Sequence, residues 1–238
     1  MTRAIALRAT DYSENDKIVT LYSLEYGKIS VRARGIRKNN AKLKFCADQF
    51  CFGNYELSKS SDDRFVLKTC KQMESFYSLR EDVASYYAAC VIAECLAVCT
   101  QDGQPDSDIF VETLKALQAL TSEIEPLLVV LRYLLYFLAK EGFMLNLSEC
   151  SVCAKPLSKA YWDSVAGNVV CADCRSTSNL ALSARTVAIC RLVNGLPYEK
   201  LSSLNYSRDV LKEALDLCSK HVSLSFAPLR SLVELRRL

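Results

Sequence analysis

Two pairs of cysteines are the residues of this chain best suited to chemistry. Cys150 and Cys153 form one Cys-x-x-Cys unit, and Cys171 and Cys174 form a second one after seventeen intervening residues. Each unit can bend the backbone so that two sulfurs face one point, and four thiolates complete a tetrahedral shell around Zn²⁺. Because such a closed shell leaves no position for a water molecule, we expect one structural zinc ion and no metal catalysis.

The alternatives to a zinc site are four ordinary reduced thiols and a redox-active pair. A redox pair would need only one Cys-x-x-Cys unit, and no β-α-β pattern surrounds either of the two. Residues 161–170, between the units, have the pattern of a short hairpin that could cover a metal. We therefore expect a zinc ribbon over residues 148–180. The other eight cysteines, expected to be small core residues in a reducing cytosol, are Cys46, Cys51, Cys70, Cys90, Cys95, Cys99, Cys190 and Cys218.

A cluster of cations could bind phosphate groups. From position 28 to position 44 the chain has seven Lys or Arg residues and no acid. They are Lys28, Arg32, Arg34, Arg37, Lys38, Lys42 and Lys44. In a strand over residues 28–36, alternation would place Lys28, Arg32 and Arg34 on one face, opposite three apolar residues. This pattern fits a groove that follows a phosphate backbone, and it also fits an exposed edge strand that charges protect from pairing.

Aromatic residues follow this basic stretch closely. They are Phe45, Phe50, Phe52 and Tyr55. Aromatic rings beside cations can stack on nucleobases. In a small barrel, however, most such residues belong to the core.

The sequence contains no recognisable set of residues for covalent catalysis. There is no glycine-rich phosphate loop, no His-Glu-x-x-His and no nucleophile elbow. The single histidine, His221, falls near the end of an expected helix, where contact with the helix dipole or with solvent is the ordinary role. The acids of the middle segment are expected to complement helix N-termini rather than to hold Mg²⁺. They include Asp102, Asp106, Asp108, Glu112, Glu123 and Glu125.

Charge is unevenly distributed along the 238 residues, although the net charge is only +3. Residues 1–80 carry fifteen Lys/Arg and nine Asp/Glu, residues 81–149 carry three and eleven, and residues 150–238 carry twelve and seven. A basic N-terminal module beside an acidic middle segment indicates different partners for each. The first residues lack the apolar stretch of a signal peptide, and the longest apolar run, 127–139, is too short to cross a bilayer. We expect a cytoplasmic protein without membrane contact.

The β-rich and helical patterns predict an α+β protein with two domains. The β-rich stretches are 5–12, 17–24, 28–36, 45–57 and 65–77. Five strands within residues 1–78 are the size of a small closed barrel, for which the OB-fold is the leading candidate and an SH3-like barrel has a similar pattern. From residue 79 the apolar spacing becomes helical, and we expect a helical domain over 79–238 that the ribbon interrupts.

Helix signals locate the elements of the second domain. Expected helices cover 81–101, 107–120, 126–140, 184–195, 208–221 and 229–238. Either Asp106 or Ser107 is a suitable N-cap of the second helix, Ser183 and Ser207 are suitable N-caps of later ones, and Pro126 is a suitable first residue. The helix that begins at Pro126 is apolar on nearly all sides, so we expect it at the centre of the bundle.

Three stretches in this order resemble the RecO family of bacterial recombination mediators. Residues 26–38 resemble the strand and basic loop of the family, and residues 132–143 resemble the helix that leads to its zinc site. The first Cys-x-x-Cys unit follows at the expected place, and residues 228–232 resemble the C-terminal signature. The resemblance extends over essentially the whole chain, and the order of the motifs is more specific than any one of them.

The resemblance implies a DNA repair protein without enzymatic activity. RecO proteins bind single- and double-stranded DNA, anneal complementary strands and act with RecR to load RecA onto strands coated by the single-strand-binding protein, SSB. For this chain, the resemblance implies that the seven cations contact DNA and that the protein joins the bacterial nucleoid when it acts. It also implies that the helical domain binds the acidic, apolar C-terminal tail of SSB. Some members lack the zinc cysteines, whereas this chain keeps all four. Cations that could border a groove for the tail are Arg132, Lys140, Arg230, Arg236 and Arg237.

Two other classes of protein share parts of this pattern. A zinc-ribbon scaffold that binds only proteins would have the same barrel, helices and ribbon, but it would show no salt-sensitive affinity for DNA. A nuclease that uses the acidic middle segment would cleave DNA with Mg²⁺.

Overall fold

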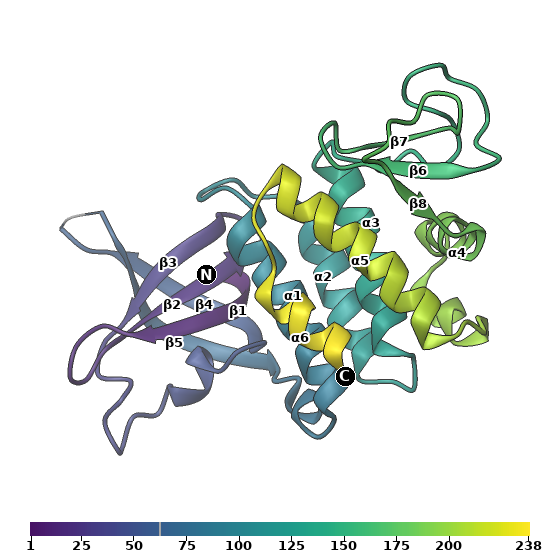
Figure 1. The fold of residues 1–238 in the computed structure, drawn as a ribbon. Coiled ribbons are helices and arrows are strands. Elements are labelled where there is room, and N and C mark those ends of the chain that lie inside the picture. The colour runs from purple at the N-terminus through teal and green to yellow at the C-terminus, as the bar shows by residue number, and fades with distance from the viewer. Residues whose placement is uncertain (62) are drawn as a thin grey trace. The chain divides into compact units, whose positions relative to one another are not determined.

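The computed structural model describes residues 1–61 and 63–238 (Figure 1). The chain forms two compact units, residues 1–82 with 93–117 and residues 83–92 with 118–238. Helices α1 (Val83–Cys99) and α2 (Ser107–Leu120) each contribute residues to both units. The division at residues 78 and 79 stays a prediction about domains.

The first unit contains a closed five-stranded barrel. Its strands are β1 (Thr2–Asp11), β2 (Lys17–Ser23), β3 (Gly27–Ala33), β4 (Phe52–Lys59) and β5 (Phe65–Glu74). The order around the barrel is β1-β2-β3-β5-β4, and β4 pairs back onto β1. All neighbours are antiparallel except β3 and β5. This is the five-stranded barrel of the OB-fold, so the predicted fold class is confirmed.

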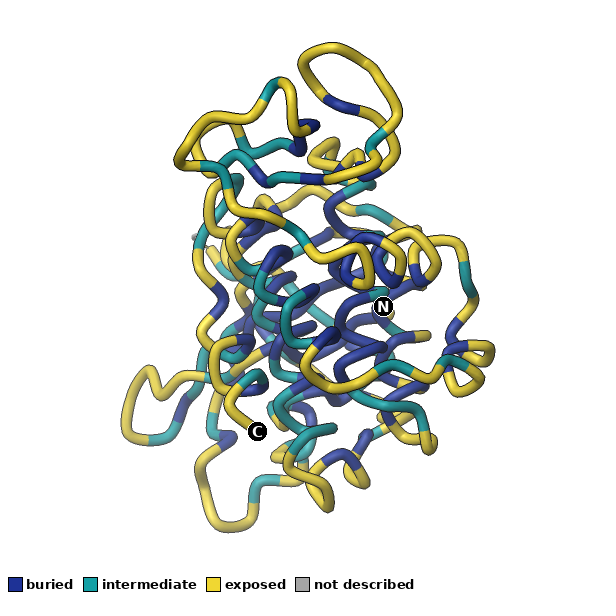
Figure 2. The backbone as a smooth tube through the Cα atoms, turned by 45° about the vertical axis from the view of Figure 1, so that its right-hand side comes forward, coloured by how far each residue is buried: buried dark blue, intermediate teal, exposed yellow. Residues whose placement is uncertain are grey.

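Alternation along β3 separates the barrel core from the surface. Ile29, Val31 and Ala33 are at most 7% exposed, whereas Lys28 and Arg32 on the opposite face are partly exposed. The predicted orientation of this strand is therefore confirmed. In Figure 2 the buried and exposed stretches of the whole chain can be followed along the backbone.

The strand predicted over residues 45–57 is only partly present. Lys44–Ala47 forms a short 3-10 helix, η1, and β4 begins at Phe52. Phe50 between them has a φ of 74°, which interrupts an extended strand. Cys46 and Phe50 are nevertheless fully buried. These apolar residues were correctly expected to be buried, but burial alone does not determine whether a segment forms a strand or a helix.

The loop between α1 and α2 lies against the start of β3 within the first unit. Gly27 has a φ of 63°, and a Cβ atom on it would lie 2.2 Å from the carbonyl oxygen of Gln104. Glycine is required here because the backbone conformation and the close approach both exclude a side chain. The Gly103 N–H donates to the carbonyl oxygen of Lys28 at 2.9 Å, which fixes the loop on the strand.

The second unit is organised around α3 (Pro126–Lys140). The other helices are α4 (Ala184–Asn194), η3 (Tyr198–Ser203), α5 (Arg208–Ser225) and α6 (Arg230–Arg237), and η2 (Tyr77–Arg80) precedes α1. Ten of the fifteen residues of α3 are buried, and both α4 and α5 pack against it. The predicted central position of this helix is confirmed.

Predicted helix starts can be recognised in the hydrogen bonds. The Asp106 carboxylate accepts the N–H groups of Asp108 and Ile109 at 2.8 and 2.9 Å, and the Ser183 hydroxyl accepts that of Thr186 at 3.1 Å. Both side chains satisfy N–H groups that a helix leaves without internal partners.

His221 is not a surface residue, contrary to expectation. It is 4% exposed, and its Nε2 lies 2.8 Å from the carbonyl oxygen of Phe143. Desolvation lowers its pKa, so the ring is neutral at pH 7. The helix continues to Ser225, and the turn that carries His221 faces the core.

The ribbon is a small three-stranded sheet in the second unit. Its strands are β6 (Ala160–Asp163), β7 (Asn168–Val170) and β8 (Leu180–Leu182), in the order β7-β6-β8. The predicted hairpin corresponds to β6 and β7, which pair antiparallel. A very small core of Cys150, Val170 and Cys171 lies beside this sheet, and Trp162 on β6 is 4% exposed. Across the described residues, no helix combines the length and apolarity needed to cross a membrane.

Candidate functional site

The two predicted cysteine pairs meet in the ribbon. The four sulfur atoms of Cys150, Cys153, Cys171 and Cys174 all lie within 4.8 Å of one another, and those of Cys153 and Cys171 are 3.8 Å apart. A tetrahedron with Zn–S bonds of ~2.3 Å has sulfur–sulfur edges of about 3.8 Å. The four cysteines can therefore bind one metal ion.

The backbone around the first pair prepares a sulfur for metal binding. The Ala154 N–H donates to the carbonyl oxygen of Cys150 at 2.9 Å, and Ala154 itself has a φ of 57°. Desolvation opposes ionisation of Cys150, but backbone N–H groups, including those of Cys153 and Cys171, lower its pKa to about 6. The thiolate, which is the form that binds metals, is thus favoured.

No second group of this kind occurs among the residues that the structure describes. In particular, the acids of the middle segment do not converge on a point. Asp102 pairs with Lys28, and Asp106 caps α2. Asp106 thus has the expected role at a helix start, whereas Glu112 is 5% exposed in the interior of α2.

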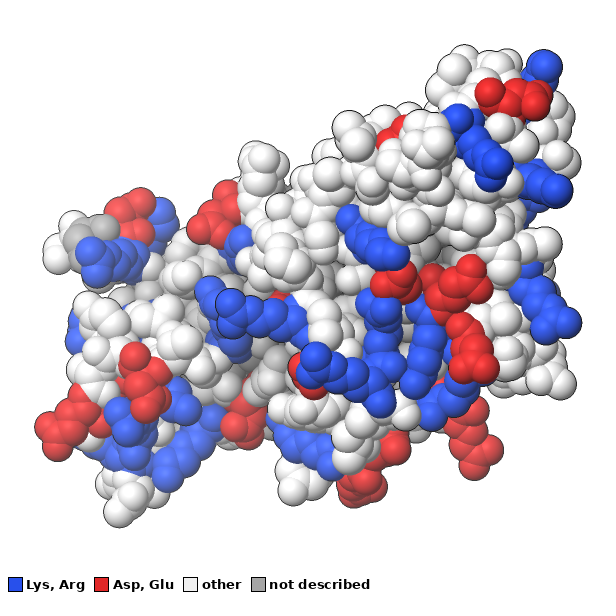
Figure 3. All heavy atoms as spheres, viewed as in Figure 1, with Lys and Arg blue, Asp and Glu red and all other residues white. Residues whose placement is uncertain are grey.

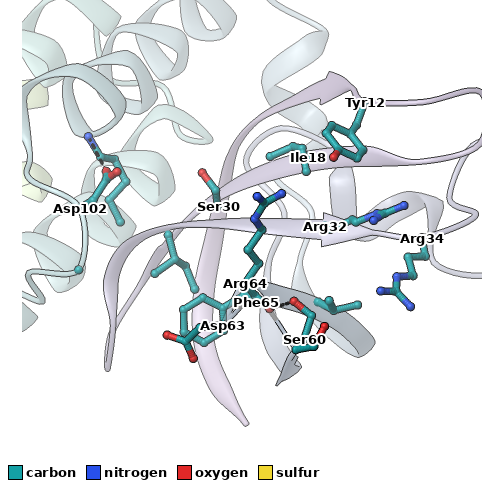
Figure 4. A pocket seen from close by; sticks show the side chains of 15 residues that line it. Tyr12, Ile18, Ser30, Arg32, Arg34, Ser60, Asp63, Arg64, Phe65 and Asp102 are labelled. Carbon is teal, nitrogen blue, oxygen red and sulfur yellow. Dashed lines mark hydrogen bonds and ion pairs between the residues drawn. The ribbon is translucent and has the colours of Figure 1, made fainter.

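A hollow of about 750 Å³ lies on the β2–β3 face of the barrel (Figure 4). The loops that connect β1 to β2 and β4 to β5 contribute to its walls. Among its lining residues are Tyr12, Arg32, Arg34, Arg64, Phe65 and Asp102. In OB-folds, this face and these two loops are where oligonucleotides and oligosaccharides bind.

Asp16 fixes the basic side of this hollow. Its Oδ2 accepts from Nε and Nη2 of Arg32 at 2.9 and 2.7 Å, and its Oδ1 accepts from the N–H of Gly35 at 2.8 Å. The Arg32 guanidinium in turn lies 5.1 Å from the ring centroid of Tyr12. The hydrogen bond from Gly35, followed by that from Arg32, lowers the pKa of Asp16. Arg32 is therefore an ion-paired residue that positions Tyr12.

We expect Asp16→Asn to lower the free energy of unfolding by about 1–3 kcal/mol at neutral pH, because charge-assisted hydrogen bonds are lost. Since folding lowers the pKa of Asp16, its stabilisation is fully present above the ordinary Asp pKa near ~4 and is lost as pH falls through the lowered value. Urea unfolding of the parent and the variant from neutral to acidic pH should show that their difference in free energy of unfolding disappears below pH ~4. A difference that stays constant over this pH range would contradict this role of Asp16.

The Lys28 side chain is bound within the first unit and is not available on the surface. Its Nζ donates to the carbonyl oxygens of Ala97 and Thr100 at 2.9 and 2.5 Å and pairs with Asp102 at 3.3 Å. Only 13% of its side chain is exposed. The ammonium satisfies carbonyl groups at the C-terminal end of α1, so we leave Lys28 out of the surface proposed below.

Of the remaining predicted cations, some line one of two hollows, and Lys38 and Lys42 line neither. Arg34 lines the large hollow, whereas Arg37 and Lys44 line a second one of about 360 Å³. Arg37 pairs with Asp11 at 3.3 Å, and Lys44 donates to the carbonyl oxygen of Asn39 at 3.2 Å.

Three exposed cations of the basic stretch have no ion pair with an acid among the described residues. They are Arg34, Lys38 and Lys42. Figure 3 shows cationic and acidic side chains interleaved over the strands of the barrel.

The four aromatic residues that follow the basic stretch do not line the hollow, in agreement with the expectation that most of them belong to the core. Phe50 and Tyr55 are at most 1% exposed, and Phe45 and Phe52 are partly buried. The hollow is instead lined by Tyr12, which is 51% exposed, and by Phe65. Tyr12 lies in a loop and Phe65 begins β5, and neither is adjacent to the basic stretch in sequence. The parallel pairing of β3 with β5 brings Phe65 to this face, and contact with Arg32 brings Tyr12 to it.

The five cations predicted to border a partner groove stay a prediction, and three of them have defined partners. Arg132 Nε donates to the carbonyl oxygen of Leu196 at 2.8 Å. Arg236 pairs with Asp216 at 2.6 Å, and Arg237 pairs with Glu234 at 2.9 Å. Lys140 and Arg230 are exposed.

The fold and the cysteine cluster define an α+β protein with an OB-fold barrel and a ribbon whose four cysteines can bind a metal ion. Two family models match the chain, "Recombination protein O N terminal" over residues 1–78 and "Recombination protein O C terminal" over residues 80–232. The chain belongs to the RecO family of DNA repair proteins.

Curated relatives share most of the chain. A DNA repair protein RecO from Clostridium acetobutylicum is 25% identical over 236 residues, which are 98% of this chain and 95% of that protein. The RecO protein of Desulfitobacterium hafniense is 31% identical over 225 residues, with 90% and 80% covered. That of Bacillus pumilus is 27% identical over 220 residues, with 90% and 86% covered.

Proposed function

We propose that this protein binds single- and double-stranded DNA through its barrel and anneals complementary strands without catalysing bond cleavage. The observation that carries the proposal is the position of β3. This strand pairs with β2 on one side and with β5 on the other, so it is not an edge strand. Protection of a sheet edge is therefore not the reason for the exposed cations Arg34, Lys38 and Lys42, which follow this strand and have no ion pair with an acid among the described residues, and phosphate binding is the explanation that remains.

The proposed phosphate surface comprises the exposed cations of the basic stretch. They are Arg34, Arg37, Lys38, Lys42 and Lys44. Contacts of this kind hold the strand by its backbone and leave base edges able to pair with a second strand. Arg32 contributes by positioning Tyr12, because Asp16 already neutralises its charge.

The metal of the ribbon is proposed to be one zinc ion with a structural role. Four sulfur ligands at tetrahedral spacing are the donor set of a closed zinc site. Zinc bound there would hold the two cysteine pairs together and supply no position for a substrate.

We propose that the partners are RecR, the C-terminal tail of SSB and, indirectly, RecA, in the bacterial cytoplasm and at the nucleoid. For the acidic, apolar tail, we propose a hollow of about 340 Å³ between the ribbon and α4 in place of the five cations that the sequence suggested. Its walls include Leu157, Tyr161 and Val187 together with Lys159 and Arg191. Apolar walls bordered by cations match such a peptide.

The test is a titration of labelled single strands and duplexes at two salt concentrations, with an annealing assay in the absence of ATP. We expect affinity that falls steeply with salt, little dependence on sequence, and faster annealing of complementary strands.

Three results would contradict this function. Affinity too weak to measure at low salt would favour a scaffold that binds only proteins. Annealing that requires ATP hydrolysis would indicate an enzyme. Cleavage with Mg²⁺ that persists through purification would indicate a nuclease.

A further inference from the structure

Tyr12 is held in a defined orientation although half of it is exposed. Its exposed fraction is 51%, and the guanidinium of Arg32 lies 5.1 Å from its ring centroid. Arg32 is itself fixed by two hydrogen bonds to Asp16, a residue that is 8% exposed. An exposed aromatic ring is usually mobile. Here a buried carboxylate orders the cation, and the cation orders the ring.

The same loop is tied to the barrel by its backbone. The Tyr12 N–H donates to the carbonyl oxygen of Asp16 at 3.0 Å, and the Arg37 N–H donates to that of Asn15 at 3.0 Å. The ring of Tyr12 therefore has a preformed position at the edge of the hollow. A preformed ring loses little conformational freedom when a flat ligand stacks on it.

The hollow beside Tyr12 has the size and lining of a nucleotide site. Figure 4 shows Tyr12 and Phe65 on opposite sides of it and Arg34 at one end. Arg34 is exposed and has no ion pair with an acid among the described residues. The volume of about 750 Å³ falls within the range of ~300–1,000 Å³ that is usual for small-molecule sites.

We infer that this hollow receives an unpaired nucleotide of a single strand, with the base stacked on Tyr12 and a neighbouring phosphate on Arg34. A base within a duplex has both faces covered by its neighbours and cannot stack on a protein ring. A base in a single strand has a face available, and its hydrogen-bonding edge stays accessible for pairing. The hollow thus distinguishes single strands from duplexes without reading sequence. This inference rests on the proposed DNA-binding function.

The test compares an oligothymidylate with an abasic strand of the same length, which carries the same phosphates without bases. For the parent protein we expect the oligothymidylate to bind at least about tenfold more tightly, since stacking of a base on an aromatic ring has that magnitude. Tyr12→Ala should abolish this preference and leave affinity for the abasic strand and for a duplex unchanged. Tyr12→Phe, which keeps the ring, should keep the preference.

A matched control is Tyr77→Ala. Tyr77 belongs to the same compact unit and is 67% exposed, but it is not among the lining residues of the hollow. This variant should bind all three probes like the parent. Equal affinity of the parent for the oligothymidylate and the abasic strand would overturn the inference and leave the DNA-binding function standing. An equal loss of affinity for the oligothymidylate and the abasic strand in Tyr12→Ala would also overturn the inference and leave the DNA-binding function standing. Failure of the parent to bind any probe would overturn the function itself.

Discussion

Replacing Arg34, Lys38 and Lys42 together by alanine is expected to weaken DNA binding by about 100-fold at ~0.15 M salt. Each phosphate contact contributes about 0.9 to the salt slope for duplex DNA and about 0.7 for single strands. Losing three contacts should therefore make the slope shallower by about 2 to 3. Affinity should fall alike for all sequences, because phosphate contacts carry no base information. Titrations over a series of salt concentrations measure both effects.

The barrel offers a control with the same change in charge. Arg3, Lys68 and Lys71 are exposed on β1 and β5, and they are not among the lining residues of the two hollows of the barrel. Their replacement by alanine should leave most of the affinity and the salt slope in place. If both triple variants weaken binding equally, the basic stretch has no special role, and the effect is one of net charge alone.

The parts of the fold that the sequence predicted are those specified by local signals. Pro126 at the first position and a continuous apolar surface defined α3 with its observed bounds. The two Cys-x-x-Cys units predicted the cluster of four cysteines because ligands at this spacing leave few alternatives. Alternation along β3 predicted the correct core face, because the two-residue period of a strand is set by its own backbone.

The parts that the sequence did not predict depend on contacts between distant residues. Lys28 belongs to a run of cations, yet its partners lie about seventy positions further along the chain. Arg32 is neutralised by Asp16, which the sequence presents as one acid of a polar loop. The ring beside the hollow, Tyr12, comes from the loop that leads to β2. A run of charges thus predicts a surface, but which charges remain available to a ligand is decided by the tertiary partners.

The second large effect is expected in the ribbon. Cys171→Ser should release the metal and unfold residues 148–180, because a sheet of this size has too little apolar surface to be stable alone. Trp162, the only tryptophan of the chain, is 4% exposed within β6, so its fluorescence should shift to longer wavelength when the ribbon opens. The zinc content measured by metal analysis should fall from one ion per chain to none. Binding of zinc to such sites is worth about 10–16 kcal/mol, so partial occupancy is not expected at ordinary concentrations.

The barrel should survive this substitution, because its core contains none of the ribbon residues. Hydrogen exchange of β1 to β5 should therefore match that of the parent while exchange in β6 to β8 becomes fast. Cys190→Ala is the matched control, since it removes a buried thiol of α4 that lies outside the cluster. It should reduce stability modestly and keep the full zinc content. A parent protein purified without chelator and found to contain no zinc would contradict the assignment. Zinc retained in full by the Cys171 variant would do the same.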